Sequence, residues 1–484
     1  MNKELSVDKL TLQSGATIRQ AMHAINIGGL GLCFVLCEGR LVGVLSDGDV
    51  RRALLNGVAL EDAVESVMRQ DFFCLPVNAP LNLIQHNLGV FKYIPIVNDR
   101  GEMVDLASSQ RYHHIPLVQP VFDGNELEYV TDCIQSGWIS SQGKYVLQFE
   151  ENFGEYVGCR HTLAVSNGTV ALHLSLVALG VGPGDEVIVP DLTFAASVNA
   201  ILYTGATPIL VDVDRRTMAI DPDLVAAAIT SRTRAIMPVH LYGHPAEMDS
   251  LMDLANQYDL LIIEDCAEAL GTRYQGAHVG TFGDAATFSF FGNKTITTGE
   301  GGMLLFRNPV IRERAKMLRD HGMSPERRYW HDEVGFNYRL TNIQAAIGVA
   351  QLEKIHSVVN RKRWIAAQYD KHLADIVQLQ LPIDPKGNQS LNSYWLYTIV
   401  LAPEYVIRRD EILELLKNHG IEARPVFFPM HRMPPYIKYS QAGECYSGAN
   451  HLSDGGICLP SSITVTENEI ERVCAVLRSV FQSE

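Results

Sequence analysis

The sequence predicts an α/β protein of at least two parts, and three observations carry that prediction. The chain has 484 residues, which is more than one ordinary hydrophobic core accommodates. From about residue 116 onward, unbroken apolar runs alternate with helical patterns, as expected for a mostly parallel sheet buried on both faces. Residues 1–113 instead repeat a shorter pattern of strand, tight turn and strand.

Composition argues against several classes of function. The mean hydropathy of +0.03 suits a soluble globular protein, and no apolar run reaches the roughly 18 residues of a membrane helix. The first residues lack the basic start and apolar stretch of a signal peptide, and the nine cysteines show no paired spacing. A net charge of −15 disfavours non-specific binding to nucleic acid. We therefore expect a protein of the reducing cytoplasm, without membrane or nucleic-acid partners.

Two segments of the N-terminal part carry the repeat. They read CFVLCEGRLVGVLSDGDVRRAL (Cys33–Leu54) and YIPIVNDRGEMVDLASSQR (Tyr93–Arg111). Each predicts a strand, a tight turn, a second strand and a polar segment, with the turns at 38–39 and 99–101. This duplicated pattern resembles a pair of CBS domains, which implies a regulatory module over residues 1–113.

The resemblance also implies a nucleotide site in the first repeat. Ser46 and Asp49 match the Ser/Thr-x-x-Asp pattern with which that family holds the phosphate and ribose of a nucleotide. The alternative is that Asp49 only caps a helix, which is the commoner task of this residue type. In the second repeat Ser108 is followed by Arg111, so the ribose carboxylate is missing there.

The larger part contains six expected strands. The segment after the first strand reads NGTVALHLSLVALG and predicts a helix. Because ligands of parallel sheets bind at the carboxyl ends of the strands, functional residues are expected where the strands end. The strands lie in Thr162–Ser166, Glu186–Pro190, Thr207–Asp214, Arg234–Gly243, Asp259–Asp265 and Ala286–Gly292.

Chemically useful residues follow four of these strands. The turn 167–169 opens a helix whose free N–H groups suit a phosphate, and Phe194 follows the second strand. Asp265 ends the fifth strand, and Ser289 and Lys294 belong to the last strand and its loop. Taken singly, these residues have ordinary interpretations as turn, core, cap and solvated loop. Taken together, a phosphate cradle, an aromatic plate, a carboxylate and a lysine are what pyridoxal phosphate requires.

From about residue 116 to 484 the sequence resembles the DegT/DnrJ/EryC1/StrS sugar aminotransferases. The resemblance implies the fold of PLP-dependent aspartate aminotransferases (fold type I), with a large domain over 114–375 and a smaller C-terminal α+β domain over 376–484. Six blocks carry it: SGWISSQGKYVLQFEENFGEYVG, SNGTVALHLSLVALGVGPGDEVIVPDLTFAASVNAI, EDCAEALG, FSFFGNKTITTGEGGML, GFNYRLTNIQAAIGVAQLE and GIEARPVFFPMHRMPPY.

The resemblance assigns roles position by position. Lys294 is the Schiff-base lysine, and Asp265 is the partner of the pyridine nitrogen. Asn337 reaches the phosphate in the neighbouring subunit, which implies a homodimer with active sites at the interface. The other cofactor residues are a partner of the ring hydroxyl (Glu268), a ring-stacking aromatic (Phe194) and three phosphate ligands (Gly168, Thr169 and Ser289). The ordinary interpretation of Asn337 is a turn residue.

Two stretches, Arg327–Asn342 and the one around residues 424–436, look close to those of the GDP-perosamine synthases in this family. This implies transfer of an amino group from L-glutamate to C4 of GDP-4-keto-6-deoxymannose, with O-antigen of lipopolysaccharide as the destination by analogy. A pyrophosphate needs a cationic donor, for which several arginines are available. The substrate candidates are Arg327, Arg328, Arg339, Arg424, Trp330, His331 and His431.

Three alternatives stay open from the sequence: a C3-aminotransferase, a 3-dehydratase, and a nucleotide-sensing regulatory protein without catalysis. Dehydratase relatives carry histidine where Lys294 stands, which favours transamination. Every cofactor position is filled, which disfavours an inactive regulator.

Overall fold

The computed structural model describes residues 7–108, 114–385, 387, 389–441 and 443–481. The chain divides into two compact units, the first over residues 1–114 and the second over residues 115–417 and 421–484. Within the described part of the chain, no helix combines the length and the hydropathy that a membrane span requires.

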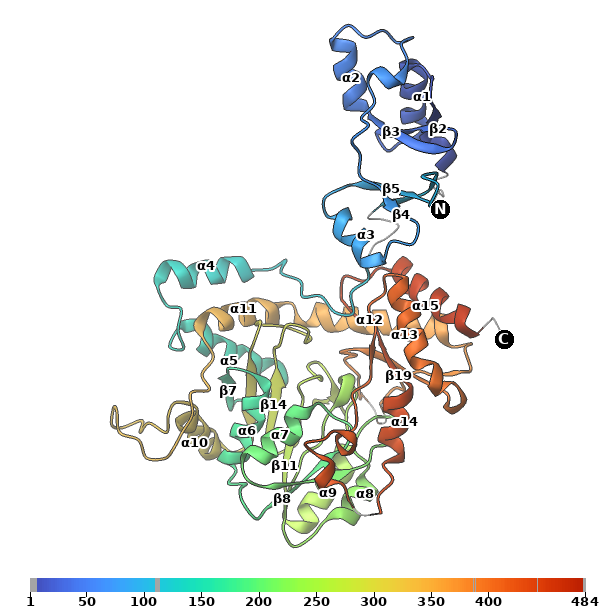
Figure 1. Cartoon of the computed structure of the whole chain (residues 1–484). Helices are drawn as coiled ribbons and strands as arrows, with labels where there is room; N and C mark the ends of the chain where they lie inside the picture. Colours follow the sequence, from blue (N-terminus) through green and yellow to red (C-terminus); the bar gives the residue numbers. More distant parts are fainter. Residues whose placement is uncertain (1–6, 109–113, 386, 388, 442, 482–484) are drawn as a thin grey trace. The chain divides into compact units, whose positions relative to one another are not determined.

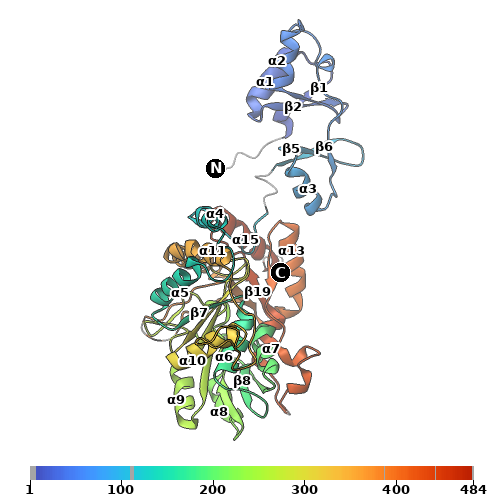
Figure 2. The ribbon, with the colours of Figure 1, turned by 90° about the vertical axis from the view of Figure 1, so that its left-hand side faces the viewer.

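The first unit contains the same small sheet twice. In each copy the first strand pairs parallel with the second, which pairs antiparallel with the third. Figure 2 shows α1 and α2 beside the first sheet and α3 beside the second. The first copy comprises β1 (Thr11–Gln13), α1 (Ile18–Gly28), β2 (Leu32–Cys37), β3 (Arg40–Ser46) and α2 (Asp47–Leu55). The second comprises β4 (Leu75–Pro76), α3 (Leu81–Leu88), β5 (Tyr93–Val97) and β6 (Met103–Ser108).

The predicted turns explain these hairpins. Glu38 and Gly39 both have positive φ (50° and 80°), as a tight turn between right-twisted antiparallel strands requires. Gly101 supplies the same kind of conformation in the second copy, with φ 78°. The predicted repeat is therefore confirmed, although Arg111 lies outside the described residues.

The second unit is built on a seven-stranded sheet in the order β7-β15-β14-β11-β10-β8-β9. Strands β14, β11, β10, β8 and β9 pair parallel, and β15 is antiparallel to both of its neighbours. The predicted, mostly parallel sheet is thus confirmed, with one antiparallel strand that was not foreseen. The strands are β7 (Thr162–Val165), β8 (Glu186–Pro190), β9 (Thr207–Val211), β10 (Thr233–Ile236), β11 (Leu261–Asp265), β14 (Ala285–Ser289) and β15 (Gly302–Phe306).

One expected strand is shorter than predicted. The stretch Arg234–Gly243 is a strand only up to Ile236. Pro238 follows, and its lack of an N–H group removes a bond from the ladder. The next residues return to the sheet through isolated bonds, including the one from the His240 N–H to the Asp265 carbonyl at 3.0 Å.

Alternate residues of the strands enter different cores. Ala286 and Phe288 of β14 pack in one hydrophobic cluster, whereas Ala285 packs in another with residues of α6 and α10. This alternation is what burial on both faces demands. Figure 1 shows the labelled strands with helices around them. The helices are α4 (Glu126–Ser136), α5 (Lys144–Val157), α6 (Gly168–Ala178), α7 (Ala195–Tyr203), α8 (Pro222–Ala228), α9 (Met248–Tyr258), α10 (Pro309–Arg319) and α11 (Asn342–Glu353).

The C-terminal part adds a four-stranded antiparallel sheet in the order β16-β17-β19-β18. Its strands are β16 (Leu379–Gln380), β17 (Tyr397–Leu401), β18 (Arg424–Pro425) and β19 (Gly456–Leu459), and its helices are α12 (Ile355–Leu373), α13 (Arg409–Asn418), α14 (Ser447–Gly455) and α15 (Glu467–Phe481). This is the expected α+β arrangement. The boundary between residues 375 and 376 stays a prediction.

Candidate active site

A cavity of about 700 Å³ lies where the strands of the large sheet end. Because β7 and β14 run in the same direction as β11 and β8, their carboxyl ends share one edge of the sheet. The sequence-predicted residues that line the cavity are Gly168, Thr169, Phe194, Asp265, Glu268, Ser289, Lys294 and Arg424. Residues from separate parts of the chain are thus brought together by the sheet topology.

One end of the cavity suits an anion. Asn167 begins α6, and its side chain accepts the N–H of Val170 at 3.0 Å. The N–H groups of Gly168 and Thr169 have no hydrogen-bond partner among the described residues, so the helix start can receive a phosphate. A Cβ atom at position 168 would lie 2.9 Å from the Cβ of Ser289, so only glycine leaves this cradle open.

The glycines near Lys294 are required for a different reason than Gly168. A Cβ at Gly302 would lie 2.6 Å from the carbonyl oxygen of Asn167, because β15 passes directly beside the turn before α6. Gly299 adopts a positive φ of 80° in the preceding loop. These glycines therefore serve the backbone that builds the cradle.

Asp265 is buried at the end of β11, and its hydrogen-bond donors among the described residues are neutral. Its carboxylate accepts the Ser197 hydroxyl at 2.8 Å and the Ala267 N–H at 3.1 Å. Burial raises the pKa of Asp265, and these bonds and the charge of Lys294 offset this only in part. A protonated pyridine nitrogen would supply the positive charge that this carboxylate lacks. No pattern in the sequence singled out Ser197, which lies on α7.

Lys294 points toward the second acidic residue of the site. Its Nζ atom donates to Glu268 Oε1 at 3.1 Å, and Glu268 Oε2 accepts the Tyr242 N–H at 3.1 Å. Burial raises the pKa of Glu268 in spite of the neighbouring lysine. The Lys294 Nζ atom also lies 3.9 Å from the centroid of the Trp395 ring. Neither Tyr242 nor Trp395 was predicted as a site residue, since each lies far from Lys294 in the sequence.

Phe194 caps the start of α7 and lies at the wall of the cavity. It is 59% exposed, so the alternative of an ordinary core residue is wrong. Its ring centroid lies 5.7 Å from that of Phe427, which in turn packs on Tyr242 at 5.5 Å. An exposed aromatic face at the rim suits stacking on a flat ligand.

The substrate candidates divide into two groups. Arg424 lines the cavity and donates to Glu422 at 2.8 Å, with its side chain 56% exposed. The other predicted substrate residues, and Asn337, are not among the described residues that line this cavity within one chain. Arg339 forms an ion pair with Asp320.

The loop before Asn337 is exposed. Trp330 is 51% exposed and donates its Nε1–H to Asp332 at 3.1 Å. His331 donates from Nδ1 to the His321 carbonyl at 2.9 Å. The guanidinium carbon of Arg327 lies 4.4 Å from the Trp330 ring centroid, and that of Arg328 lies over Tyr329.

His431 lies outside the lining of the cavity. Its Nδ1 atom lies 2.6 Å from Asp191 Oδ2, and its ring stacks on Tyr446 with a centroid distance of 4.4 Å. These contacts hold the segment after β18 against the end of β8.

Ser46 and Asp49 of the first unit form a capping box at the start of α2. Asp49 accepts both the hydroxyl (2.6 Å) and the N–H (3.1 Å) of Ser46, and it also pairs with Arg69 and Arg52. Burial alone would raise the pKa of Asp49, but these hydrogen bonds lower it to about 2. The capping alternative therefore describes the structure, and a nucleotide role stays a prediction.

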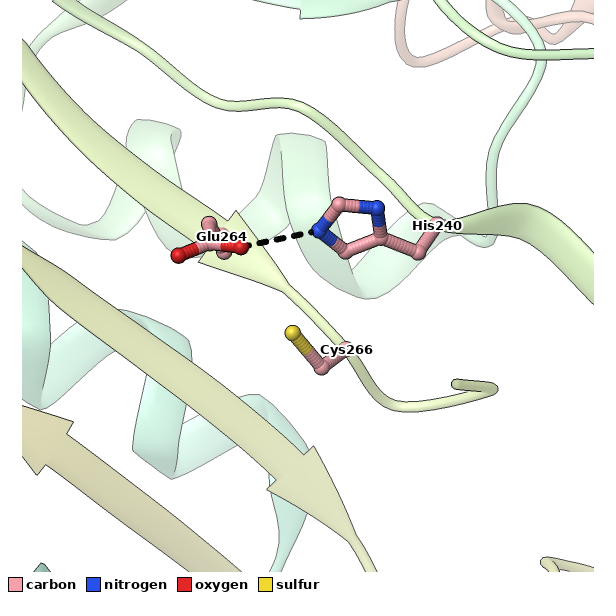
Figure 3. Close-up of side chains that lie close together, drawn as sticks. All are labelled: His240, Glu264 and Cys266. Atoms are coloured by element: carbon pink, nitrogen blue, oxygen red, sulfur yellow. Dashed lines mark hydrogen bonds and ion pairs between the residues drawn. The ribbon is translucent and has the colours of Figure 1, made fainter. Parts of the chain in front are cut away.

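One buried cluster beside the site has metal-ligating residue types: His240, Glu264 and Cys266 (Figure 3). His240 Nδ1 accepts the Ala246 N–H at 3.0 Å, so its proton resides on Nε2 and is donated to Glu264 at 3.1 Å. Glu264 also accepts the N–H groups of residues 280, 282 and 283. These bonds account for the cluster, which anchors the strand that carries Asp265.

Comparison with known proteins identifies relatives of both units. Residues 120–478 match the model of the DegT/DnrJ/EryC1/StrS aminotransferase family, and residues 2–56 match the CBS domain. The chain is 44% identical over 367 residues to GDP-perosamine synthase of Vibrio cholerae, which covers 76% of this chain and 99% of the relative. It is 46% identical over 367 residues to GDP-perosamine synthase of Caulobacter vibrioides, which covers 76% and 98%.

Solved structures that are similar to this chain include one in a PLP form. A sugar aminotransferase from Streptococcus pneumoniae, solved in its PLP form, is 28% identical with a TM-score of 0.72. The match covers 77% of this chain and 99% of that chain.

Proposed function

The chain belongs to the DegT/DnrJ/EryC1/StrS aminotransferase family, and from this premise we propose that it moves an amino group from L-glutamate to the 4-keto carbon of GDP-4-keto-6-deoxymannose. One observation carries the choice of substrate: GDP-perosamine synthases are 44–46% identical to this chain over almost their whole length. The product would be GDP-perosamine. A cytoplasmic location and a role in O-antigen synthesis stay proposals.

The cofactor is pyridoxal phosphate, as in the family and its PLP-form structures. The cavity fits it, since a side chain at position 168 would close the phosphate cradle and Asp265 forms no ion pair within the described part of the chain. When bound, the cofactor supplies an aldehyde that takes up the amino group and a ring that withdraws electrons. Gly168, Thr169 and Ser289 would hold the phosphate, and Phe194 would stack on the ring.

The protein residues then have distinct tasks. Lys294 would hold the cofactor and, once released, would move a proton between the substrate and the cofactor. Asp265 would keep the ring nitrogen protonated, and Ser197, which donates to that carboxylate, would hold it in place. Glu268 receives the ammonium group of Lys294 and, by family resemblance, the ring hydroxyl.

For the nucleotide sugar, Arg424 is the cation that faces the cavity in the same chain. Arg339, Trp330, His331 and Asn337 belong to an exposed stretch, which we propose reaches the cavity of a second subunit. This requires a homodimer. His431 would act indirectly, by holding the segment that follows Arg424.

The decisive experiment is mass spectrometry of the products formed from a panel of nucleotide-linked keto sugars with glutamate. We expect an amino sugar from the GDP-linked 4-keto substrate. The Lys294→Ala variant is the negative control and should form no amino sugar. Product from a UDP- or dTDP-linked sugar alone would overturn the nucleotide assignment, and amination at C3 would overturn the regiochemistry. Loss of a hydroxyl without amination would indicate a dehydratase.

For the first unit we propose a regulatory nucleotide near Ser46 and Asp49, as its CBS resemblance suggests. Binding would have to displace Arg52 or Arg69 from Asp49 or use them for the phosphate. Turnover measured with a set of nucleotides, in the full chain and in a chain without residues 1–113, tests this. Identical turnover under all conditions would leave the unit a structural role.

A further inference from the structure

Trp395 contributes an aromatic face to the site from the segment that leads into the smaller C-terminal sheet. It lies just before β17 and is 4% exposed. The Lys294 Nζ atom lies 3.9 Å from the centroid of its ring, within the range of a cation–π interaction. The same Nζ atom lies 3.1 Å from Glu268 Oε1. The ammonium group is thus held between a carboxylate and an indole face.

These contacts close into a ring. The Trp395 side chain stacks on Tyr242 with an interplanar angle of 7° and a centroid distance of 6.0 Å. The Tyr242 N–H donates to the carboxylate of Glu268, which accepts from Lys294. Each member therefore positions the next.

Trp395 is itself anchored at two points. Its Nε1–H donates to the carbonyl of Asn293, the residue before Lys294, at 2.7 Å. Its own carbonyl accepts from the buried Nζ atom of Lys362 on α12 at 3.0 Å. An indole held by its ring nitrogen and by its backbone cannot move away from the lysine without breaking the hydrogen bond to Asn293.

We propose that Trp395 and Glu268 form the resting site of the Lys294 ammonium group, which the lysine occupies whenever it is not bonded to the cofactor. The inference rests on the proposed role of Lys294 and adds a positioning residue to it. During amino transfer the lysine is released and must return, so a defined resting site keeps its amino group near the reaction and in one place.

The test uses the full chain freed of cofactor, so it requires no turnover. Trace acetylation with acetic anhydride at pH 8, followed by peptide mass spectrometry, measures the reactivity of Lys294 relative to the exposed Lys417. The Lys294 side chain is only 14% exposed, and the contact of its Nζ atom with the indole face shields it from the reagent. We therefore expect Lys294 labelling to rise about three- to tenfold in Trp395→Leu and by less than about twofold in Trp395→Phe, which keeps an aromatic face.

Matched variants separate this role from packing. Phenylalanine and leucine fill similar volumes, so equal labelling in Trp395→Phe and Trp395→Leu would show that Trp395 only packs, and would overturn the proposal. Trp364→Leu removes a tryptophan that lies 3.9 Å from the guanidinium carbon of Arg361 instead, and it should leave Lys294 labelling unchanged. Because Lys362 is buried, its labelling would report that a variant has unfolded. If Trp395→Leu unfolds, the labelling of Lys294 in Trp395→Phe is compared with that in the wild type instead.

Failure of this inference and failure of the proposed function are distinguishable. Unchanged labelling in Trp395→Leu, in a protein that still forms the amino sugar, would reject the resting site alone. Raised labelling in a protein that aminates no keto sugar would support the resting site and reject the proposed function.

Discussion

Two buried carboxylates, one in each unit, have opposite surroundings. Asp49 accepts hydrogen bonds from Ser46 and is paired with two arginines, which lower its pKa to about 2. Asp265 accepts from one hydroxyl and one N–H group, and burial raises its pKa. A carboxylate whose partners come from the chain serves the fold, whereas one left short of positive charge beside a cavity is prepared for a cationic ligand.

The largest effect is expected from Asp265→Asn. The amide cannot keep the ring nitrogen protonated, so turnover should fall about 10²- to 10⁴-fold, as measured by product formation under cofactor saturation. Asp284→Asn is the matched control, because Asp284 accepts the Ile262 N–H at the opposite end of the same strands. Near-normal turnover in Asp265→Asn would contradict the claim that the Asp265 carboxylate is prepared for a cationic ligand.

Asp49→Asn tests the claim that the Asp49 carboxylate stabilises the fold of the first unit. It removes the charge from the capping box and leaves Arg52 and Arg69 without their partner, so the first unit should lose about 1–2 kcal/mol of stability. Urea unfolding of the full chain at neutral pH measures this. An unchanged unfolding transition of the first unit would contradict the prediction, because it would mean that the bonds of Asp49 do not stabilise the fold.

The same residue predicts an acid dependence. Its folded pKa of about 2 lies below the usual value of about 3.9, so its contribution is fully present above about pH 4 and is lost as the pH falls through 2. Thermal unfolding between pH 5 and 2 should show this loss in wild type. In Asp49→Asn the corresponding slope should be absent.

Ser197→Ala sharpens the comparison by removing one of the few bonds that Asp265 has. We expect turnover to fall about fivefold, since a single hydrogen bond contributes on the order of 1 kcal/mol. Ser175→Ala on α6 is the control, because its buried hydroxyl donates only to the Leu172 carbonyl. Equal turnover in both variants would assign Ser197 to packing.

The smallest effect is on stability and has the opposite sign. In the cofactor-free chain, burial of the Asp265 charge is unfavourable, and the stability it costs grows as the pH rises above about 4. Asp265→Asn should therefore raise the melting temperature of the second unit by a few degrees at pH 7, as seen by calorimetry. A lower melting temperature would indicate that the charge is already compensated within the chain.

Local patterns predicted much of the fold and the site. The turn residues 38–39 and the apolar strand runs specify their own conformations, so the hairpins and the parallel strands were foreseen. Lys294, Asp265 and Gly168 follow strands directly, and parallel strands bring such residues to one edge. The antiparallel β15 was not foreseen, because the direction of a strand depends on its neighbours.

The sequence by itself determined which residues stand at the strand ends and that the chain can hold pyridoxal phosphate. Only the tertiary structure decided which partners those residues have. Ser197 reaches Asp265 from α7, Trp395 reaches Lys294 from the segment before β17, and Asp49 meets Arg69 across 20 residues. The reason is physical: backbone preferences act within a few residues, whereas the charge state and position of a buried side chain depend on whatever the folded chain packs against it.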